Sequence, residues 1–126
     1  MGIDIYAVWK GQTEEERKRQ FEVWLTSASG HIGYLREAYH GEPYATRFLF
    51  SEAFASEDHE AGIPAKTLRE RLPEALQLVE RREREVYEVT NERQIEWVRE
   101  SFRSFVALCE RKEKETGAPV VIRASY

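Results

Sequence analysis

IDIYAVW, at residues 3–9, is the stretch that decides the fold. Ile3 and Ile5 alternate with more polar neighbours, and β-branched and aromatic residues dominate, which is typical of a β-strand. A second run of this kind, VVI at 120–122, lies near the other end of the chain. A lone strand would leave its backbone N–H and C=O groups unpaired. We therefore expect these two strands to pair with each other.

Helical patterns occupy the sequence between the two strands. TEEE at 13–16 is a capping box and predicts a helix from about Thr13 to Leu25, on which Phe21, Trp24 and Leu25 form an apolar stripe. Apolar residues three and four positions apart predict a second, short helix that ends at Gly41 and presents Ile32, Leu35 and Tyr39.

Two further helices follow in the second half of the chain. One is expected to begin at Pro64, to be broken or restarted at Pro73, and to reach about Val89. The other shows the clearest periodicity, in which apolar residues recur up to Cys109 before Gly117 ends the helix; they are Ile95, Val98, Phe102, Phe105 and Val106.

Residues 44–54 are ambiguous, because the short apolar run at 47–50 fits either a strand or one turn of a buried helix. Pro43 suits the start of a helix, which favours the helical interpretation. Residues 55–62 read as a polar loop. The whole pattern predicts one α+β domain over residues 1–126, mostly helical, with about five helices packed on a minimal sheet that pairs the N-terminal and C-terminal strands.

The charge pattern argues against nucleic acid as a partner. The chain carries 19 basic and 23 acidic residues, a formal net charge of −4. Residues 64–116 hold twelve of each sign, interleaved along helices, whereas a surface that binds phosphate backbones concentrates basic residues. Pairs such as Glu80 with Arg84 are expected to form ion pairs across one helical turn.

Several common classes of protein are excluded by absent motifs. The chain has no phosphate-binding glycine loop, no dinucleotide fingerprint, no His-Glu-x-x-His and no Cys-x-x-Cys pair, so we predict neither a metal nor a cofactor. No apolar run is long enough to span a membrane. One cysteine, Cys109, and the lack of a secretory signal at residues 1–10 indicate a cytoplasmic protein.

The densest group of polar and aromatic residues runs from His31 to Arg47. On the predicted short helix, Arg36 and His40 share a face. Arginine and histidine donate hydrogen bonds to anions, and tyrosines offer flat contact surface. We therefore predict a ligand-binding segment for a small anionic or polar group, or for a protein partner; its residues are Tyr34, Arg36, Tyr39, His40, Tyr44 and Arg47.

Part of this segment carries a resemblance. The opening MGIDIY at 1–6, the stretch GYLREAYHG at 33–41 and PYAT at 43–46 resemble small uncharacterised bacterial proteins. The resemblance covers about a quarter of the chain. It implies a bacterial, cytoplasmic protein and carries no activity or cofactor.

The leading hypothesis is a non-catalytic binding domain, and two alternatives remain open. The first is a small enzyme that uses His40 or His59 with Glu37 or Asp58 as an acid–base pair. The second is a subunit of a homodimer, since the aromatic stripe with Phe102 exceeds what one small core is expected to cover.

Overall fold

The computed structural model describes residues 2–23, 29–39 and 41–126. In these ranges it contains five α-helices and a four-stranded antiparallel sheet, so the predicted α+β class is confirmed. The elements follow one another as β1 (Gly2–Val8), α1 (Glu14–Glu22), the 3₁₀ turn η1 (Gly30–Ile32), β2 (Tyr34–Ala38), α2 (Ala45–Leu49), α3 (Ser51–Ala55), β3 (Glu60–Ile63), α4 (Ala65–Glu85), α5 (Glu92–Thr116) and β4 (Val120–Ser125).

The sheet has the strand order β2-β1-β4-β3, with both terminal strands at its centre. Ile5 of β1 lies opposite Ala124 of β4, which confirms the predicted pairing of the two ends of the chain. The sheet is nevertheless larger than predicted, because β2 and β3 add one strand on each side. All three pairings are antiparallel.

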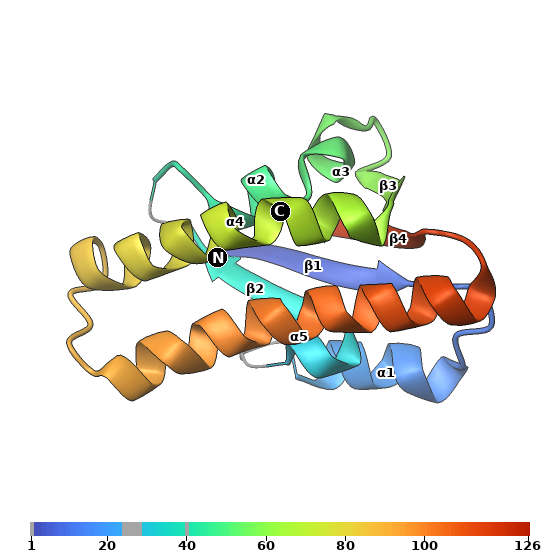
Figure 1. Ribbon diagram of the computed structural model, residues 1–126, viewed down its shortest axis with the longest axis horizontal. Coiled ribbons are helices and arrows are strands. Elements are labelled where there is room, and N and C mark those ends of the chain that lie inside the picture. The colour runs from blue at the N-terminus through green and yellow to red at the C-terminus, as the bar shows by residue number, and fades with distance from the viewer. Residues whose placement is uncertain (1, 24–28, 40) are drawn as a thin grey trace.

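The core lies between one face of this sheet and the helices α4 and α5 (Figure 1). Strand β1 alternates strictly, with Ile3, Ile5 and Ala7 fully buried under the helices. Its other residues point to the opposite, partly exposed face. The alternation that marks β1 in the sequence is thus the alternation between the helix-covered face and the open face.

Helices α4 and α5 form a long antiparallel hairpin across the sheet (Figure 1). Helix α4 runs through Pro73 without a break, so the predicted interruption there is wrong. Proline has no N–H, so the carbonyl group four residues earlier loses its helical hydrogen bond. Pro73 lies on the exposed side of α4, where water can bind this carbonyl group. The helix ends at Glu85, a few residues before the predicted limit near Val89.

Helix α5 agrees closely with its sequence pattern. Asn91 caps its first turn by accepting a hydrogen bond from the Arg93 N–H at 2.9 Å, and Gly117 ends it in a left-handed conformation. Phe102 and Phe105 are both buried within the single chain. The reason given for a homodimer, an aromatic stripe too large for one core, is therefore wrong, while the dimer itself stays a prediction.

Helix α1 begins at the predicted capping box. Thr13 Oγ1 accepts from the Glu16 N–H at 3.1 Å, and Glu16 Oε1 accepts from the Thr13 N–H at 2.9 Å. The predicted apolar stripe is not confirmed, because Phe21, although its ring contacts that of Tyr6, is 53% exposed. The other two residues of that stripe lie outside the described residues.

The short helix predicted around residues 32–41 is wrong, since this segment forms strand β2. A single 3₁₀ turn precedes the strand, and Gly33 redirects the chain with a φ of 87°. The alternation that matters here has a period of two: Leu35 and Glu37 point to the helices, and Arg36 points to the open face. The helical spacing of the apolar residues was coincidental.

Residues 44–54 form two short helices, α2 and α3, so the favoured helical interpretation is confirmed. The predicted polar loop over residues 55–62 is partly wrong. Its last residues belong to β3, which pairs with β4 and places Glu60 opposite Arg123, with an ion pair of 3.0 Å. A strand of four residues with a glycine carries too weak a pattern to stand out in the sequence.

The 3₁₀ turn packs against α5 through a close backbone approach. The Gly30 N–H donates to Ser101 Oγ at 3.1 Å. A Cβ at Gly30 would lie 1.8 Å from the Ser101 carbonyl oxygen and 2.8 Å from the Phe105 nitrogen. Only glycine allows this contact, because both neighbouring atoms belong to the backbone of a helix.

Gly30→Ala is therefore expected to lower the free energy of unfolding by about 3 kcal/mol or more, at or above the upper end of the usual cost of overpacking. Gly62→Ala is the matched control, since its nearest neighbour would be Pro119 at 3.9 Å, and it should leave stability nearly unchanged. Urea unfolding followed by circular dichroism measures both. Equal stabilities of the two variants would contradict the described packing of η1 on α5.

Candidate functional site

The structure divides the predicted ligand-binding segment between two places. Tyr34 and Arg36 lie on β2 and both donate to the Asp4 carboxylate of β1. The Tyr34 hydroxyl lies 2.5 Å from Asp4 Oδ1, and the Arg36 guanidinium lies 2.7 Å from it. Burial and this carboxylate raise the pKa of Tyr34, and the hydrogen bond to Asp4 raises the pKa of Arg36. Both side chains are thus engaged within the sheet's open face, away from the rest of the segment.

The remaining residues of the segment do converge. The rings of Tyr39 and Tyr44 meet edge to face at 6.4 Å between centroids. The guanidinium of Arg47 lies 5.9 Å from the ring of Tyr44, 5.1 Å from Phe54 and 5.4 Å from Tyr126. The predicted neighbours Tyr39, Tyr44 and Arg47 therefore form one aromatic cluster with residues from α3 and from the chain's last residue.

The histidines give no acid–base pair in the ranges that the structure covers. His40 lies outside the described residues. His59 packs edge to face on Tyr126 at 4.9 Å, and Asp58 accepts from the Ser56 hydroxyl and the Glu60 N–H instead. Among the described residues no cluster of three or more His, Cys, Asp or Glu side chains is placed to hold a metal ion.

A buried ion pair that the sequence did not single out lies behind β2. Glu37 and Arg82 are only 8% and 4% exposed, and Arg82 Nε lies 3.5 Å from Glu37 Oε2. The Glu37 carboxylate also accepts from the N–H groups of Ala45 and Thr46 at 2.9 and 3.0 Å, and from the Thr46 hydroxyl at 2.6 Å. A side chain of β2 thereby caps the first turn of α2, because the side chain of the cap residue Tyr44 makes no capping hydrogen bond to this turn and accepts from the Gly41 N–H at 3.1 Å instead.

Arg82 is committed to the protein as fully as its partner. Its guanidinium donates to the carbonyl oxygens of Gly41, of Pro43 at 3.2 Å and of Ala38 at 3.3 Å. It also lies over the ring of Tyr44 at 4.6 Å. One side chain of α4 therefore holds the end of β2 and the connection to α2 in place.

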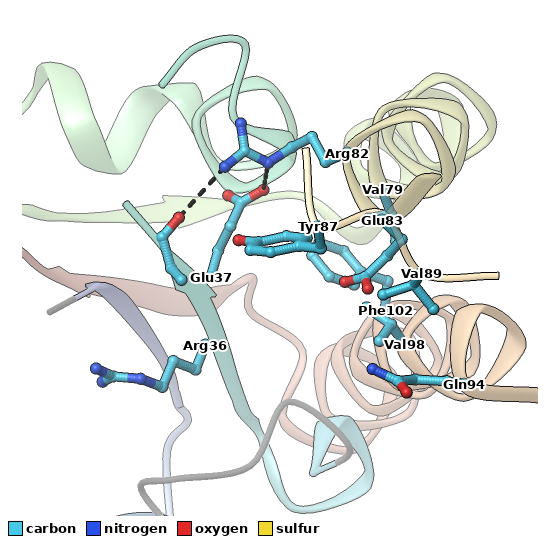
Figure 2. Close-up of a pocket in the computed structure, with 11 residues that line it drawn as sticks. Arg36, Glu37, Val79, Arg82, Glu83, Tyr87, Val89, Gln94, Val98 and Phe102 are labelled. Atoms are coloured by element: carbon cyan, nitrogen blue, oxygen red, sulfur yellow. Dashed lines mark hydrogen bonds and ion pairs between the residues drawn. The ribbon is translucent and has the colours of Figure 1, made fainter. Parts of the chain in front are cut away.

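Beside this ion pair is a pocket of about 340 Å³ between β2 and the α4–α5 hairpin (Figure 2). Its apolar walls come from both helices and their connection, namely Val79, Val89, Val98 and Phe102. Strand β2 forms the opposite wall. This volume is at the lower end of what small-molecule sites usually offer, so the pocket accommodates one side chain or a fragment of similar size.

Three polar side chains face the pocket besides the buried pair: Glu83, Tyr87 and Gln94 (Figure 2). Burial raises the pKa of the Glu83 carboxyl, although the charge of Arg82 opposes this shift. Burial also raises the pKa of the Tyr87 phenol. No hydrogen bond to the Glu83 carboxylate or the Gln94 amide is present among the described residues, so both groups are available to a ligand.

The sequence prediction and the pocket overlap in one residue, Arg36, which contributes to the wall while its guanidinium points away (Figure 2). The pairing of Glu37 with Arg82 was missed because the two residues lie far apart in the chain and Arg82 reads as an ordinary charge on a helix; Glu37 was considered only as a possible partner of a histidine. One signal was present: Arg82 falls three residues after Val79, on the apolar face of α4. Charged residues at such positions are rarely buried without a partner.

Single Arg82→Ala substitution is expected to destabilise the fold by about 3–5 kcal/mol, since it leaves the buried Glu37 carboxylate without its counter-charge. The double substitution Glu37→Gln with Arg82→Met should cost clearly less than the sum of the two single changes. Denaturant unfolding of the wild type, the two single variants and the double variant gives the coupling free energy between the two side chains. Additive costs would show that the two side chains act independently.

No described helix has the length and apolar character required to cross a lipid bilayer. Comparisons with protein-family models, curated proteins and solved structures give no match to this chain.

Proposed function

We propose that the protein is a non-catalytic binding domain whose ligand inserts an apolar group into the pocket beside β2 and presents a cation to Glu83. The observation that carries this proposal is the pocket itself, with four apolar side chains around a carboxylate that no described residue pairs. Pockets that combine apolar walls with one or two available polar groups are typical binding sites.

The charges around the pocket favour a cationic ligand over an anionic one. Arg82 already donates to three carbonyl oxygens and pairs with Glu37, so its charge is balanced and its donors are occupied. Glu83 then leaves one uncompensated negative charge at the pocket. An ammonium or guanidinium group would pair with it, whereas a carboxylate or phosphate would be repelled.

The same contacts favour binding over acid–base catalysis. Glu37 is one of the carboxylates suggested for an acid–base pair. Its oxygens accept hydrogen bonds from the first turn of α2 and pair with Arg82. Asp58 is exposed on a loop next to β3. The small-enzyme hypothesis therefore has less support than the binding domain.

The direct test uses n-pentylammonium as a probe, followed by amide and methyl chemical shifts. We expect saturable shifts at Val79 and Val98, and weaker binding as the pH falls through the raised pKa of Glu83, because the protonated carboxyl no longer attracts a cation. The charged groups that face Glu83 are Arg82 and Glu37, with the phenol of Tyr87 beside them.

Glu83→Gln should abolish the pH dependence and weaken binding, while Glu74→Gln, an exposed glutamate on the same helix, should change neither. The folded protein holds Glu83 at a raised pKa, so this carboxyl opposes folding increasingly as pH rises through that pKa. Glu83→Gln should therefore also remove that loss of stability. A probe that binds equally to wild type and Glu83→Gln at all pH values would contradict the proposal.

Arg47 supports a second candidate, the anion site predicted from the sequence. Its guanidinium is exposed, lies against three aromatic rings, and forms no ion pair with any described carboxylate. An arginine held in this way can still donate its outer N–H groups to a phosphate or carboxylate. Tyr39 and Tyr44 would line such a site as flat surfaces.

This second candidate predicts that millimolar inorganic phosphate shifts the Arg47 side-chain resonances and raises the melting temperature. Arg47→Ala should lose the effect, and Arg17→Ala, which removes an exposed charge from α1, should keep it. The same response in both variants would show that phosphate acts by general screening of charges and would contradict a site at Arg47.

The setting of the protein also remains a proposal. A single cysteine, Cys109, that is fully buried and whose thiol pKa is raised by burial is consistent with a structural role in a reducing compartment such as the bacterial cytoplasm.

A further inference from the structure

Hydrogen bonds between β1 and β2 involve alternate residues of β2. The Ala7 N–H donates to the Gly33 carbonyl oxygen at 2.9 Å, at the end of the antiparallel ladder. Bonded and non-bonded pairs alternate in such a ladder, so Leu35 and Glu37 exchange hydrogen bonds with β1. Arg36 lies between them, and its main-chain N–H and C=O point to the other side of β2.

The pairing of β1 with β4 gives the same result independently. The Ala124 N–H donates to the His59 carbonyl oxygen at 2.8 Å, so Ala124 faces β3. Its neighbour Ser125 must then face β1, where it lies opposite Asp4. The main-chain groups of Asp4 are thus directed to β4, and they do not bind Arg36 on the other side.

The free edge of β2 faces the pocket. Arg36 forms part of the pocket wall although its guanidinium points away, so its backbone is the part that faces the hollow (Figure 2). At the two ends of β2 the edge is occupied, since Arg82 donates to the Ala38 carbonyl and the Tyr34 N–H donates to the Ser29 carbonyl. At Arg36, between these two ends, no described residue makes a hydrogen bond to the main chain on this side.

We propose that a segment of a partner protein adds to β2 as a fifth strand, pairing with the main chain of Arg36 and placing one apolar side chain in the pocket. This inference rests on the proposed binding function and names the class of its ligand. An open strand edge supplies main-chain hydrogen bonds, and a neighbouring pocket selects the side chain, which is how proteins recognise extended peptides.

Strand geometry defines the partner's sequence. The residue that pairs with Arg36 would point its side chain to the open face of the sheet, and the residues before and after it would point to the helices. One of these two would meet Val98 and Phe102 in the pocket. The other would be lysine or arginine, which complements the unpaired charge of Glu83.

A polypeptide fits this place better than a small metabolite or a second copy of the chain. A second hollow shares Gln94 and Val98 with this pocket and is lined by Trp97, which is 62% exposed, so a ligand longer than the pocket finds further contact surface next to it. The α4–α5 hairpin forms the wall opposite the strand edge (Figure 2). A second copy would bring its own helical layer to the same position, whereas a single extended strand would not.

The test titrates the labelled full chain with the peptide Ac-Thr-Lys-Thr-Val-Thr-NH2, whose central threonine is placed to pair with Arg36. Amide shifts are expected at Arg36 and Ala38, together with methyl shifts at Val98. N-methylation of the central threonine removes the N–H that would bind the Arg36 carbonyl and should weaken binding about ten-fold or more. N-methylation of the neighbouring valine is the matched control, because its N–H points away from β2, and should leave the affinity nearly unchanged.

The outcomes separate this inference from the proposed function. If n-pentylammonium binds but the two methylated peptides bind alike, the pocket is a binding site and strand addition is overturned. If neither the amine nor any peptide binds, both proposals fail together. Arg36 amide shifts that grow with protein concentration in the absence of peptide would assign the edge to a second copy and overturn the inference as well.

Discussion

The ion pair between Glu37 and Arg82 is the interaction on which the arrangement around the pocket depends. It joins an edge strand and the short helix that follows it to Arg82 of a long helix, more than forty residues after the strand in the sequence. Removing either charge would leave the other buried without compensation, a far larger loss than that of an exposed ion pair. The many pairs on the outer faces of α4 and α5, such as Glu80 with Arg84 at 2.9 Å, are exposed and contribute little individually.

The buried pair also determines the chemistry that remains for a ligand. Because Arg82 uses its donors on main-chain carbonyls, the cation of the pair does not attract anions into the pocket. Glu83, one residue further along α4, is left with the negative charge that gives the pocket its sign. The ion pair between Glu37 and Arg82 thus leaves the neighbouring pocket with a preference for cations. Of the residues predicted to bind an anionic group, Arg47 is the one that still supports such a site.

How far the sequence predicts the structure differs between elements for physical reasons. Strand β1 and helix α5 were predicted because each buries one complete face, which forces a regular period of two or of about 3.6 residues on the sequence. Strand β2 was mistaken for a helix because it buries the polar residue Glu37 where an apolar residue is expected. The buried ion pair therefore hid the strand from pattern analysis.

Most of the candidate site could not be predicted from the sequence, because its residues come together only in the folded chain. Tyr44 and Arg47 could be expected to meet because they lie one helical turn apart, and they do. The pocket instead combines β2 with residues more than forty positions later, and no local spacing links them. Its strand edge depends on which residues of β1 face β4, which only the paired sheet reveals.

The most direct test of this account is amide hydrogen exchange of the free protein along β2, under conditions where the fold is intact. The N–H groups of Leu35 and Glu37 should exchange slowly because they bind β1, and the N–H of Arg36 between them should exchange much faster. Equal, strong protection at all three positions would show that the edge of β2 is covered and would contradict the account.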